Sequence, residues 1–197
     1  APTAKGIFNA INTTYKFLIH KELKESIIAI SGVGKVGSKL SKLLFEKNAN
    51  LIVSNVGSGP IDQLKYDKIS FTEFDINSIF EQECDIISPC ALGGSINSET
   101  KKKLKCLAIV GAANNQLDKS ETALWLKENN IFYAPDYLVN SGGVIAISCE
   151  INNSEDTLND QLNKISDKVL SLLEESKKSN LSTDKIAEDL AWKRISN

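Results

Sequence analysis

The feature that most constrains the fold is a regular alternation of short apolar runs with segments of helical periodicity. Runs rich in β-branched residues occur at 27–30, 51–53, 85–88, 107–110 and 131–134. Helical spacing of apolar residues predicts helices at 6–19, 36–44, 98–105 and 119–129. Strands that are apolar on both faces and separated by helices form parallel sheets that are covered on each side. We therefore expect an α/β protein with a doubly wound, mostly parallel sheet and helices on both faces.

The last part of the chain has a different pattern. Residues 157–197 carry two stretches of amphipathic helical periodicity, separated by a turn and a helix cap at 180–184. This predicts a C-terminal helical extension that either covers the sheet or braces a neighbouring domain. The Gly/Pro-dense segment 57–60 is expected to be a loop. We interpret residues 1–197 as one domain that begins with a helix within residues 1–20.

Composition excludes several classes of protein. The chain has 197 residues, a net charge of −2 and no apolar run near the roughly 20 residues of a membrane span, so we expect no nucleic-acid partner, no membrane association and a cytoplasmic location. Four cysteines and one histidine lack the spacing of a metal site, which predicts free thiols and no metal. The chain also lacks methionine, even at position 1, which indicates an excised or processed piece of a longer protein.

A glycine-rich loop follows the first predicted strand and opens a helix. Its sequence is G-x-G-x-x-G, with Gly32, Gly34 and Gly37 separated by Val33 and by the pair Lys35 and Val36. In this context the three glycines permit a tight turn, a close approach of a pyrophosphate and close helix–strand packing. The pyrophosphate would lie at the positive end of the helix. The loop predicts a Rossmann-type domain that binds a dinucleotide.

The residue after the second strand bears on the choice of dinucleotide. Dinucleotide-binding folds usually place an acidic side chain there, on the ribose 2′-hydroxyl, whereas this chain has Asn55. An amide oxygen accepts a weaker hydrogen bond than a carboxylate and repels a 2′-phosphate less. No arginine lies nearby to attract that phosphate, so we expect NAD rather than NADP as the cofactor.

Three later segments are more specific than the glycine loop. They are S-P-C-A-L-G-G-S-I-N at 88–97, G-A-A-N-N-Q-L at 111–117 and Y-A-P-D-Y-L-V-N-S-G-G-V-I at 133–145. With T-A-K-G at 3–6, these segments resemble the amino-acid dehydrogenases of the glutamate/leucine/phenylalanine/valine family, with motifs nearest to leucine dehydrogenase. The resemblance extends over essentially the whole chain and identifies it as the NAD-binding domain of an oxidoreductase.

The resemblance also implies roles for individual residues. Small residues at the ends of two strands would let a flat nicotinamide lie against the backbone, and nearby asparagines would supply amide groups. Those that would contact the cofactor are Thr3, Gly32, Gly34, Lys35, Val36, Gly37, Asn55, Cys90, Ala91, Ala113, Asn114, Asn115 and Asn140. Asn115 would also contact the substrate carboxylate, and Val144 and Ile147 would line the pocket for an aliphatic side chain, although core packing explains these two apolar residues equally well.

The reaction implied by the resemblance is reversible oxidative deamination of a branched-chain amino acid, such as leucine, to a 2-oxo acid, ammonia and NADH. In this family the catalytic lysines and a partner aspartate belong to a preceding substrate domain. We expect that domain to be absent here, so that no catalytic residue lies in this chain and the chain alone binds NADH without turnover. The full-length enzyme is expected to be a homo-oligomer that receives its amino-acid or 2-oxo-acid substrate through the missing domain.

Two other interpretations stay open. The chain could be a non-catalytic dinucleotide-binding module, either a truncated remnant or a subunit that completes a partner. It could also belong to a Rossmann dehydrogenase with other substrates, which leaves the segments at 111–117 and 133–145 unexplained.

Overall fold

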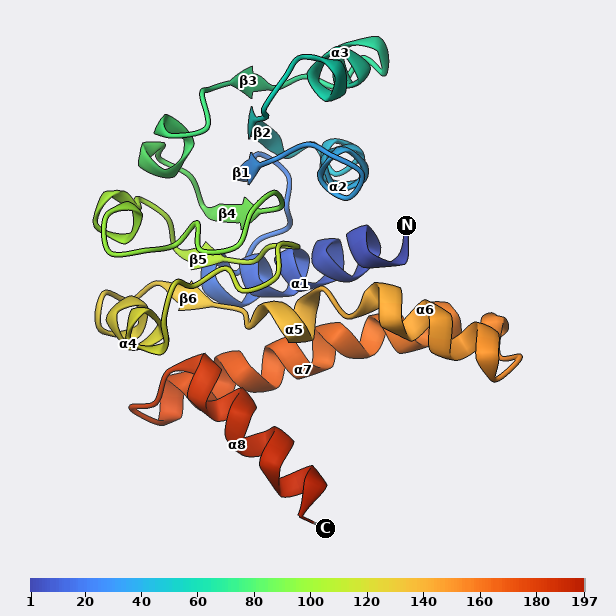
Figure 1. Ribbon diagram of the computed structural model, residues 1–197, viewed down its shortest axis with the longest axis vertical. Helices are drawn as coiled ribbons and strands as arrows, with labels where there is room; N and C mark the ends of the chain where they lie inside the picture. Colours follow the sequence, from blue (N-terminus) through green and yellow to red (C-terminus); the bar gives the residue numbers. More distant parts are fainter. Residues whose placement is uncertain (197) are drawn as a thin grey trace.

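The computed structural model describes residues 1–196 and is built on a six-stranded sheet in which every strand pair is parallel. The strand order is β3-β2-β1-β4-β5-β6 (Figure 1), which is the Rossmann order. The strands are β1 Ile27–Ser31, β2 Asn50–Ser54, β3 Thr72–Glu73, β4 Ile86–Pro89, β5 Ala108–Ile109 and β6 Phe132–Tyr133. The expected doubly wound parallel sheet is confirmed.

Helices connect the strands and extend the chain beyond β6. The α-helices are α1 Pro2–Ile19, α2 Gly37–Phe45, α3 Gly59–Tyr66, α4 Ser120–Glu128, α5 Asp136–Val139, α6 Gly142–Ile151, α7 Leu158–Lys178 and α8 Thr183–Ile195. Short 3-10 helices occur at η1 Ser78–Glu81, η2 Thr100–Lys103 and η3 Glu155–Thr157. Within residues 1–196, no helix has both the length and the apolar character that a membrane crossing needs.

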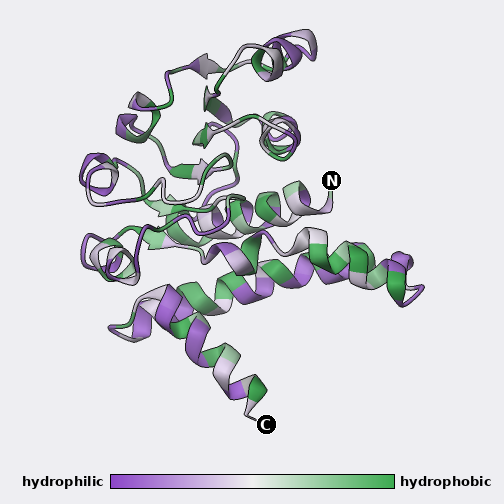
Figure 2. Cartoon of the chain, in the orientation of Figure 1, coloured by the Kyte–Doolittle hydropathy of each residue, from purple (hydrophilic) through white to green (hydrophobic). Residues whose placement is uncertain are grey.

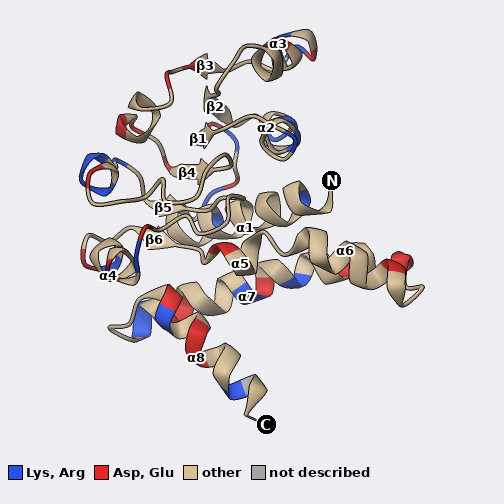
Figure 3. Cartoon of the chain, viewed as in Figure 1, with Lys and Arg blue, Asp and Glu red and all other residues tan. Residues whose placement is uncertain are grey.

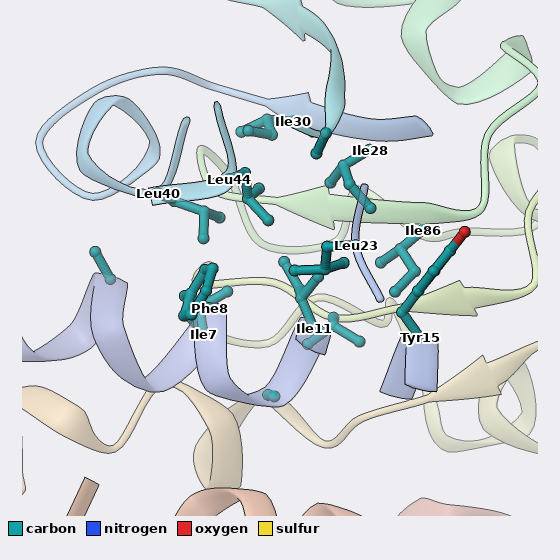
Figure 4. Close-up of a cluster of buried hydrophobic side chains, with 14 of the residues drawn as sticks. Ile7, Phe8, Ile11, Tyr15, Leu23, Ile28, Ile30, Leu40, Leu44 and Ile86 are labelled. Atoms are coloured by element: carbon teal, nitrogen blue, oxygen red, sulfur yellow. The ribbon is translucent and has the colours of Figure 1, made fainter. Parts of the chain in front are cut away.

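Alternating side chains of the strands divide the core into two layers. Ile28 and Ile30 of β1 belong to a cluster with residues of α1, α2 and α7, whereas Ala29 points to a second cluster with η1 and α4. In Figure 4, Ile7 and Phe8 of α1 lie on the side of Leu40 of α2, and Ile11 lies beside Leu23. Both faces of the sheet are thus covered, as the apolar strands predict.

The helix α7 adds a further layer against α1 (Figure 1). The buried Asn9 of α1 donates hydrogen bonds to the carbonyl oxygen of Leu162, at 3.3 Å, and to Oδ1 of Asn163, at 3.2 Å. A Cβ atom at Gly6 would lie 2.8 Å from Cδ1 of Ile165, so this glycine allows the two helices to approach. The predicted C-terminal extension is confirmed, and its last helix, α8, turns away from the sheet.

Two local predictions were wrong. The segment 98–105 forms only the 3-10 turn η2, because its lysines have no apolar face to bury and Leu104 returns to extended backbone (φ −60°, ψ 131°). Oδ1 of Asn97 accepts the N–H groups of Glu99 and Thr100 and fixes that turn. The expected loop at 57–60 instead leads into α3 from Gly59, since Pro60 suits the first turn of a helix.

The contact between α1 and α7 gives a test of the fold. Ile165 is 1% exposed, whereas Leu170 on the same helix is 38% exposed. Ile165→Ala should lower the free energy of unfolding by about 2–5 kcal/mol, because it leaves a cavity against α1. The matched variant Leu170→Ala should cost no more than about 0.5 kcal/mol, as expected for a surface substitution. Urea unfolding followed by circular dichroism measures both, and equal losses would contradict the described packing.

Candidate functional site

The candidate site lies at the carboxyl ends of β1, β4 and β5. Ser31 at the end of β1 is level with Ser54 of β2 on one side and with Pro89 of β4 on the other. The strand order reverses between β1 and β4, and ligands of doubly wound sheets bind in the crevice above that point. The glycine loop and the segments after β4 and β5 all begin there.

The three glycines of the loop have three different environments. Gly32 has φ +98°, and a Cβ there would lie 2.6 Å from Cβ of Ala91. A Cβ at Gly37 would lie 2.0 Å from the carbonyl oxygen of Gly32, so α2 begins in direct contact with the turn. At Gly34, by contrast, a Cβ would meet nothing within 4 Å. The turn and the packing position are therefore filled by protein, and the middle glycine faces open space.

The open space lies at the amino end of α2. Helix geometry leaves the first N–H groups of α2 without acceptors inside the helix, and the end carries a partial positive charge. Gly34 and Lys35 are exposed there, and residues 31–41 include no acidic side chain. Free N–H groups and positive charge at a helix start are the features that favour a bound anion.

Asn55, which was predicted to bind ribose, also holds the glycine loop in place. Its Oδ1 accepts the N–H of Val33 at 3.1 Å, and its Nδ2 donates to the carbonyl oxygens of Val56 at 2.8 Å and Gly57 at 3.1 Å. The side chain therefore links the end of β2 to the loop after β1. One lone pair of Oδ1 stays available to a ribose hydroxyl. Sequence reasoning missed this linking role.

The segment after β4 lies against the glycine loop. The N–H of Cys90 donates to the carbonyl oxygen of Ser31 at 2.8 Å, and its Sγ lies 3.4 Å from Oγ of Ser88. Burial raises the pKa of the Cys90 thiol, with a smaller opposing effect of the Ser88 hydroxyl. The thiol is therefore protonated at neutral pH and is no nucleophile. The next residue, Ala91, is exposed beside Gly32.

Two of the predicted asparagines form a pair. Nδ2 of Asn140 donates to Oδ1 of Asn114 at 2.7 Å and to the carbonyl oxygen of Ala112 at 3.3 Å. The N–H of Ala113 in turn donates to the carbonyl oxygen of Pro89 at 2.9 Å. These hydrogen bonds join the segments that follow β4, β5 and β6 at the carboxyl edge of the sheet. Asn115 is exposed with φ +51°, a backbone conformation that asparagine tolerates.

Gln116 supports this loop and was not singled out from the sequence. It is fully buried, and its Nε2 donates to the carbonyl oxygen of Ala113 at 3.0 Å across the asparagine turn. The carbonyl oxygen of Asn115 accepts the N–H of Gly94 at 2.7 Å. Gln116 belongs to the motif G-A-A-N-N-Q-L at 111–117, so its position next to Asn115 in that motif could have indicated its supporting role.

Thr3 lies beside the start of α6, because the amino end of α1 packs there. A Cβ at Gly143 would lie 3.1 Å from Oγ1 of Thr3, and one at Gly142 would lie 2.5 Å from the carbonyl oxygen of Pro2. The paired glycines therefore make room for the amino end of α1. This tertiary contact explains a helical start at Gly142 that local sequence does not reveal.

The predicted pocket residues Val144 and Ile147 are exposed on α6. Their exposed fractions are 72% and 58%, and Ile151, one further turn along, is 74% exposed. Core packing within residues 1–196 therefore does not explain them. Figure 2 shows the apolar character of α6, and Figure 3 shows charge only near its end, where Glu150 lies.

The carboxyl edge of the sheet brings together the exposed start of α2, small residues after β4 and β5, and a set of amide groups. The ionisable groups among the predicted site residues are the exposed Lys35 and the buried thiol of Cys90. Over residues 1–196, no group of three or more His, Cys, Asp or Glu side chains is placed to hold a metal ion. Among the predicted site residues, the polar groups that remain are therefore backbone N–H groups, side-chain amides and one hydroxyl, that of Thr3.

Comparisons with known proteins find amino-acid dehydrogenases as relatives of this chain. A family model described as Glutamate/Leucine/Phenylalanine/Valine dehydrogenase matches residues 53–197. Phenylalanine dehydrogenase of Thermoactinomyces intermedius is 39% identical over 98% of this chain and 54% of its own length. Leucine dehydrogenase of Bacillus cereus is 35% identical over 99% of the chain and 54% of its own length.

A solved structure shows the same fold over nearly the whole chain. The crystal structure of L-tryptophan dehydrogenase from Nostoc punctiforme superposes with a TM-score of 0.93 and 33% identity, covering 99% of this chain and 59% of that one. The chain thus spans about half the length of the curated relatives it matches. Members of the matching family are NAD(P)-dependent dehydrogenases. The chain belongs to the glutamate/leucine/phenylalanine/valine dehydrogenase family.

Proposed function

We propose that this chain is the NAD-binding part of an amino-acid dehydrogenase. The observation that carries the proposal is the cradle at the amino end of α2, where Gly34 faces open space while Gly32 and Gly37 are in tight contact with protein. Because Gly34 has no side chain, a pyrophosphate can come close to the backbone of this loop. Bound NAD supplies hydride transfer, and the protein supplies binding and orientation.

Most of the predicted contact residues are assigned here to a part of the cofactor. The N–H groups of the loop from Gly34 to Val36 hold the pyrophosphate, and Oδ1 of Asn55 accepts a ribose hydroxyl. Ala91 and Ala113 form the floor below the nicotinamide. Thr3, together with the pair of Asn114 and Asn140, supplies hydrogen-bonding groups at its carboxamide and ribose.

The substrate proposed is an amino acid with an apolar side chain, of the branched-chain type such as leucine. Support comes from the exposed apolar residues Val144 and Ile147 on a nearly uncharged helix. We assign the substrate carboxylate to Asn115, which is also exposed. The relatives named above act, by their names, on phenylalanine, leucine and tryptophan. Oxidative deamination also needs a general base, which we assign to residues outside this chain. We further propose that the full-length enzyme is a homo-oligomer.

A non-catalytic dinucleotide-binding module is the second candidate, because the ionisable side chains among the predicted site residues are the exposed Lys35 in the glycine loop and the protonated thiol of Cys90. Sequencing the coding region upstream of Ala1 separates the two. A substrate domain with glycine-flanked lysines in frame would support the enzyme, and a start codon next to Ala1 would support the module. Turnover of leucine, valine or isoleucine by the 197-residue chain alone, followed by NADH absorbance, would contradict the assignment of the catalytic base to another domain.

The glycine cradle can be tested with a pair of substitutions. Gly34→Val places a side chain in open space, so it should leave the thermal midpoint of unfolding unchanged. It should weaken NADH binding at least about tenfold, or about 1.4 kcal/mol, because the side chain occupies the pyrophosphate position. Gly37→Ala should lower both the thermal midpoint and NADH affinity, because its Cβ collides with the carbonyl oxygen of Gly32. Fluorescence titration and thermal melts measure these effects, and undiminished NADH binding by Gly34→Val would refute the cradle.

The choice between cofactors gives a further prediction. The loop of residues 55–59 after β2 carries no arginine or lysine to pair with a 2′-phosphate. NADH should therefore bind more tightly than NADPH in parallel titrations of the same protein. A lower dissociation constant for NADPH would overturn the preference for NAD.

A further inference from the structure

Two cysteines stand side by side at the amino edge of the sheet, away from the proposed NAD site. An isolated parallel bridge pairs Glu83 with Lys105, and Ile86 of β4 pairs with Ala108 of β5. Both pairs have the same offset of 22 residues, so Cys84 lies directly opposite Cys106. The N–H of Cys84 also donates to the carbonyl oxygen of Lys105 at 3.2 Å.

Both thiols face the same side of the sheet and the same cavity. Cys84 and Cys106 pack against the second core cluster, and both line a shallow surface cavity of about 370 Å³ beside Trp125. Each side chain is half-buried, so small reagents can reach it. Burial raises the pKa of Cys84 to about 12, and burial followed by the neighbouring Cys84 raises the pKa of Cys106. The two groups therefore interact and are protonated at neutral pH.

Two exposed ion pairs lie beside the paired backbone that holds the two cysteines. Nζ of Lys103 lies 2.8 Å from Oε1 of Glu81, and Nζ of Lys105 lies 3.9 Å from Oε1 of Glu83. These ion pairs join the segments that precede β4 and β5, on the amino side of both cysteines. The backbone spacing is thus set by the sheet and its flanking turns.

This spacing disfavours a direct disulfide. Neighbouring strands lie about 4.8 Å apart, and side chains in register leave the sheet in parallel, so their Cβ atoms stay at about that distance. A disulfide needs Cβ atoms about 3.8 Å apart, which the strands reach only by moving closer. If one further atom bridges the two sulfurs, the Cβ atoms can stay at the spacing that the strands impose. Soft centres are the ones that thiolates prefer.

We propose that Cys84 and Cys106 form a bidentate site for a soft, thiophilic centre, with trivalent organoarsenicals as the matching chemical class. An arsenoxide reacts with the two thiols without any oxidant. Two As–S bonds form, two S–H bonds break, and the oxide oxygen leaves as water with both protons. Arsenic stays trivalent, and the product bridges β4 and β5 at their amino ends.

Phenylarsine oxide tests the site in the wild-type chain. Intact-mass spectrometry should show one adduct with loss of one water, reversed by excess ethanedithiol. Cys84→Ser and Cys106→Ser should each weaken binding by about 100-fold or more, because the second As–S bond forms at high effective concentration. The buried Cys149 offers a matched control, and Cys149→Ser should bind as the wild type does.

Peptide mapping keeps the test independent of the stability of the variants. Trypsin should release residues 69–101 and 106–119 of the wild-type adduct as one arsenic-linked pair, with fragmentation assigning the bonds to Cys84 and Cys106. NADH titration of the adduct should give an unchanged dissociation constant, since the cysteines lie at the opposite edge of the sheet. Wild-type binding no tighter than that of the single variants, or a link to Cys90 or Cys149 instead, would overturn the proposal.

Discussion

The whole site depends on how closely α2 approaches the turn that follows β1. There is no room for a side chain at Gly37, because a Cβ there would lie 2.0 Å from the carbonyl oxygen of Gly32. The contact holds the start of α2 against the turn, and Gly34 and Lys35, which precede the helix, stay exposed. The positive end of α2 and the empty side of Gly34 are then two results of one packing contact.

The remaining loops of the site are fixed by one another rather than by the strands alone. Asn140 after β6 binds the loop after β5, and that loop binds Pro89 at the end of β4 through the N–H groups of Ala112 and Ala113. The strands themselves are short here, since β5 and β6 have two residues each. Hydrogen bonds of the Asn140 side chain thus hold the loops together beyond the point where the backbone hydrogen bonds of the sheet end.

Sequence reasoning predicted the features that have a local physical signal. Apolar runs identified β1, β2 and β4, and the glycine spacing identified the start of α2. It was wrong at 98–105, where the expected helix is only the 3-10 turn η2. It also gave no start for α6, which begins at Gly142 where the paired glycines make room for the amino end of α1. In the site, the positions of Asn114 and Asn140 were expected, but their pairing could not be, since it joins residues 26 apart through two loops.

Asn55 uses its amide in a way that limits how this protein can change. Its Oδ1 and Nδ2 together join the loops after β1 and β2, and only one lone pair is left for a ribose. An aspartate at this position would keep the acceptor for Val33 but would face the carbonyl oxygens of Val56 and Gly57 with a negative charge instead of a donor. A carboxylate that selects NAD over NADP more strongly would therefore lose the hydrogen bonds that Asn55 donates to the loop after β2. An evolutionary path from Asn55 to a carboxylate requires a compensating change in residues 56–57 at the same time.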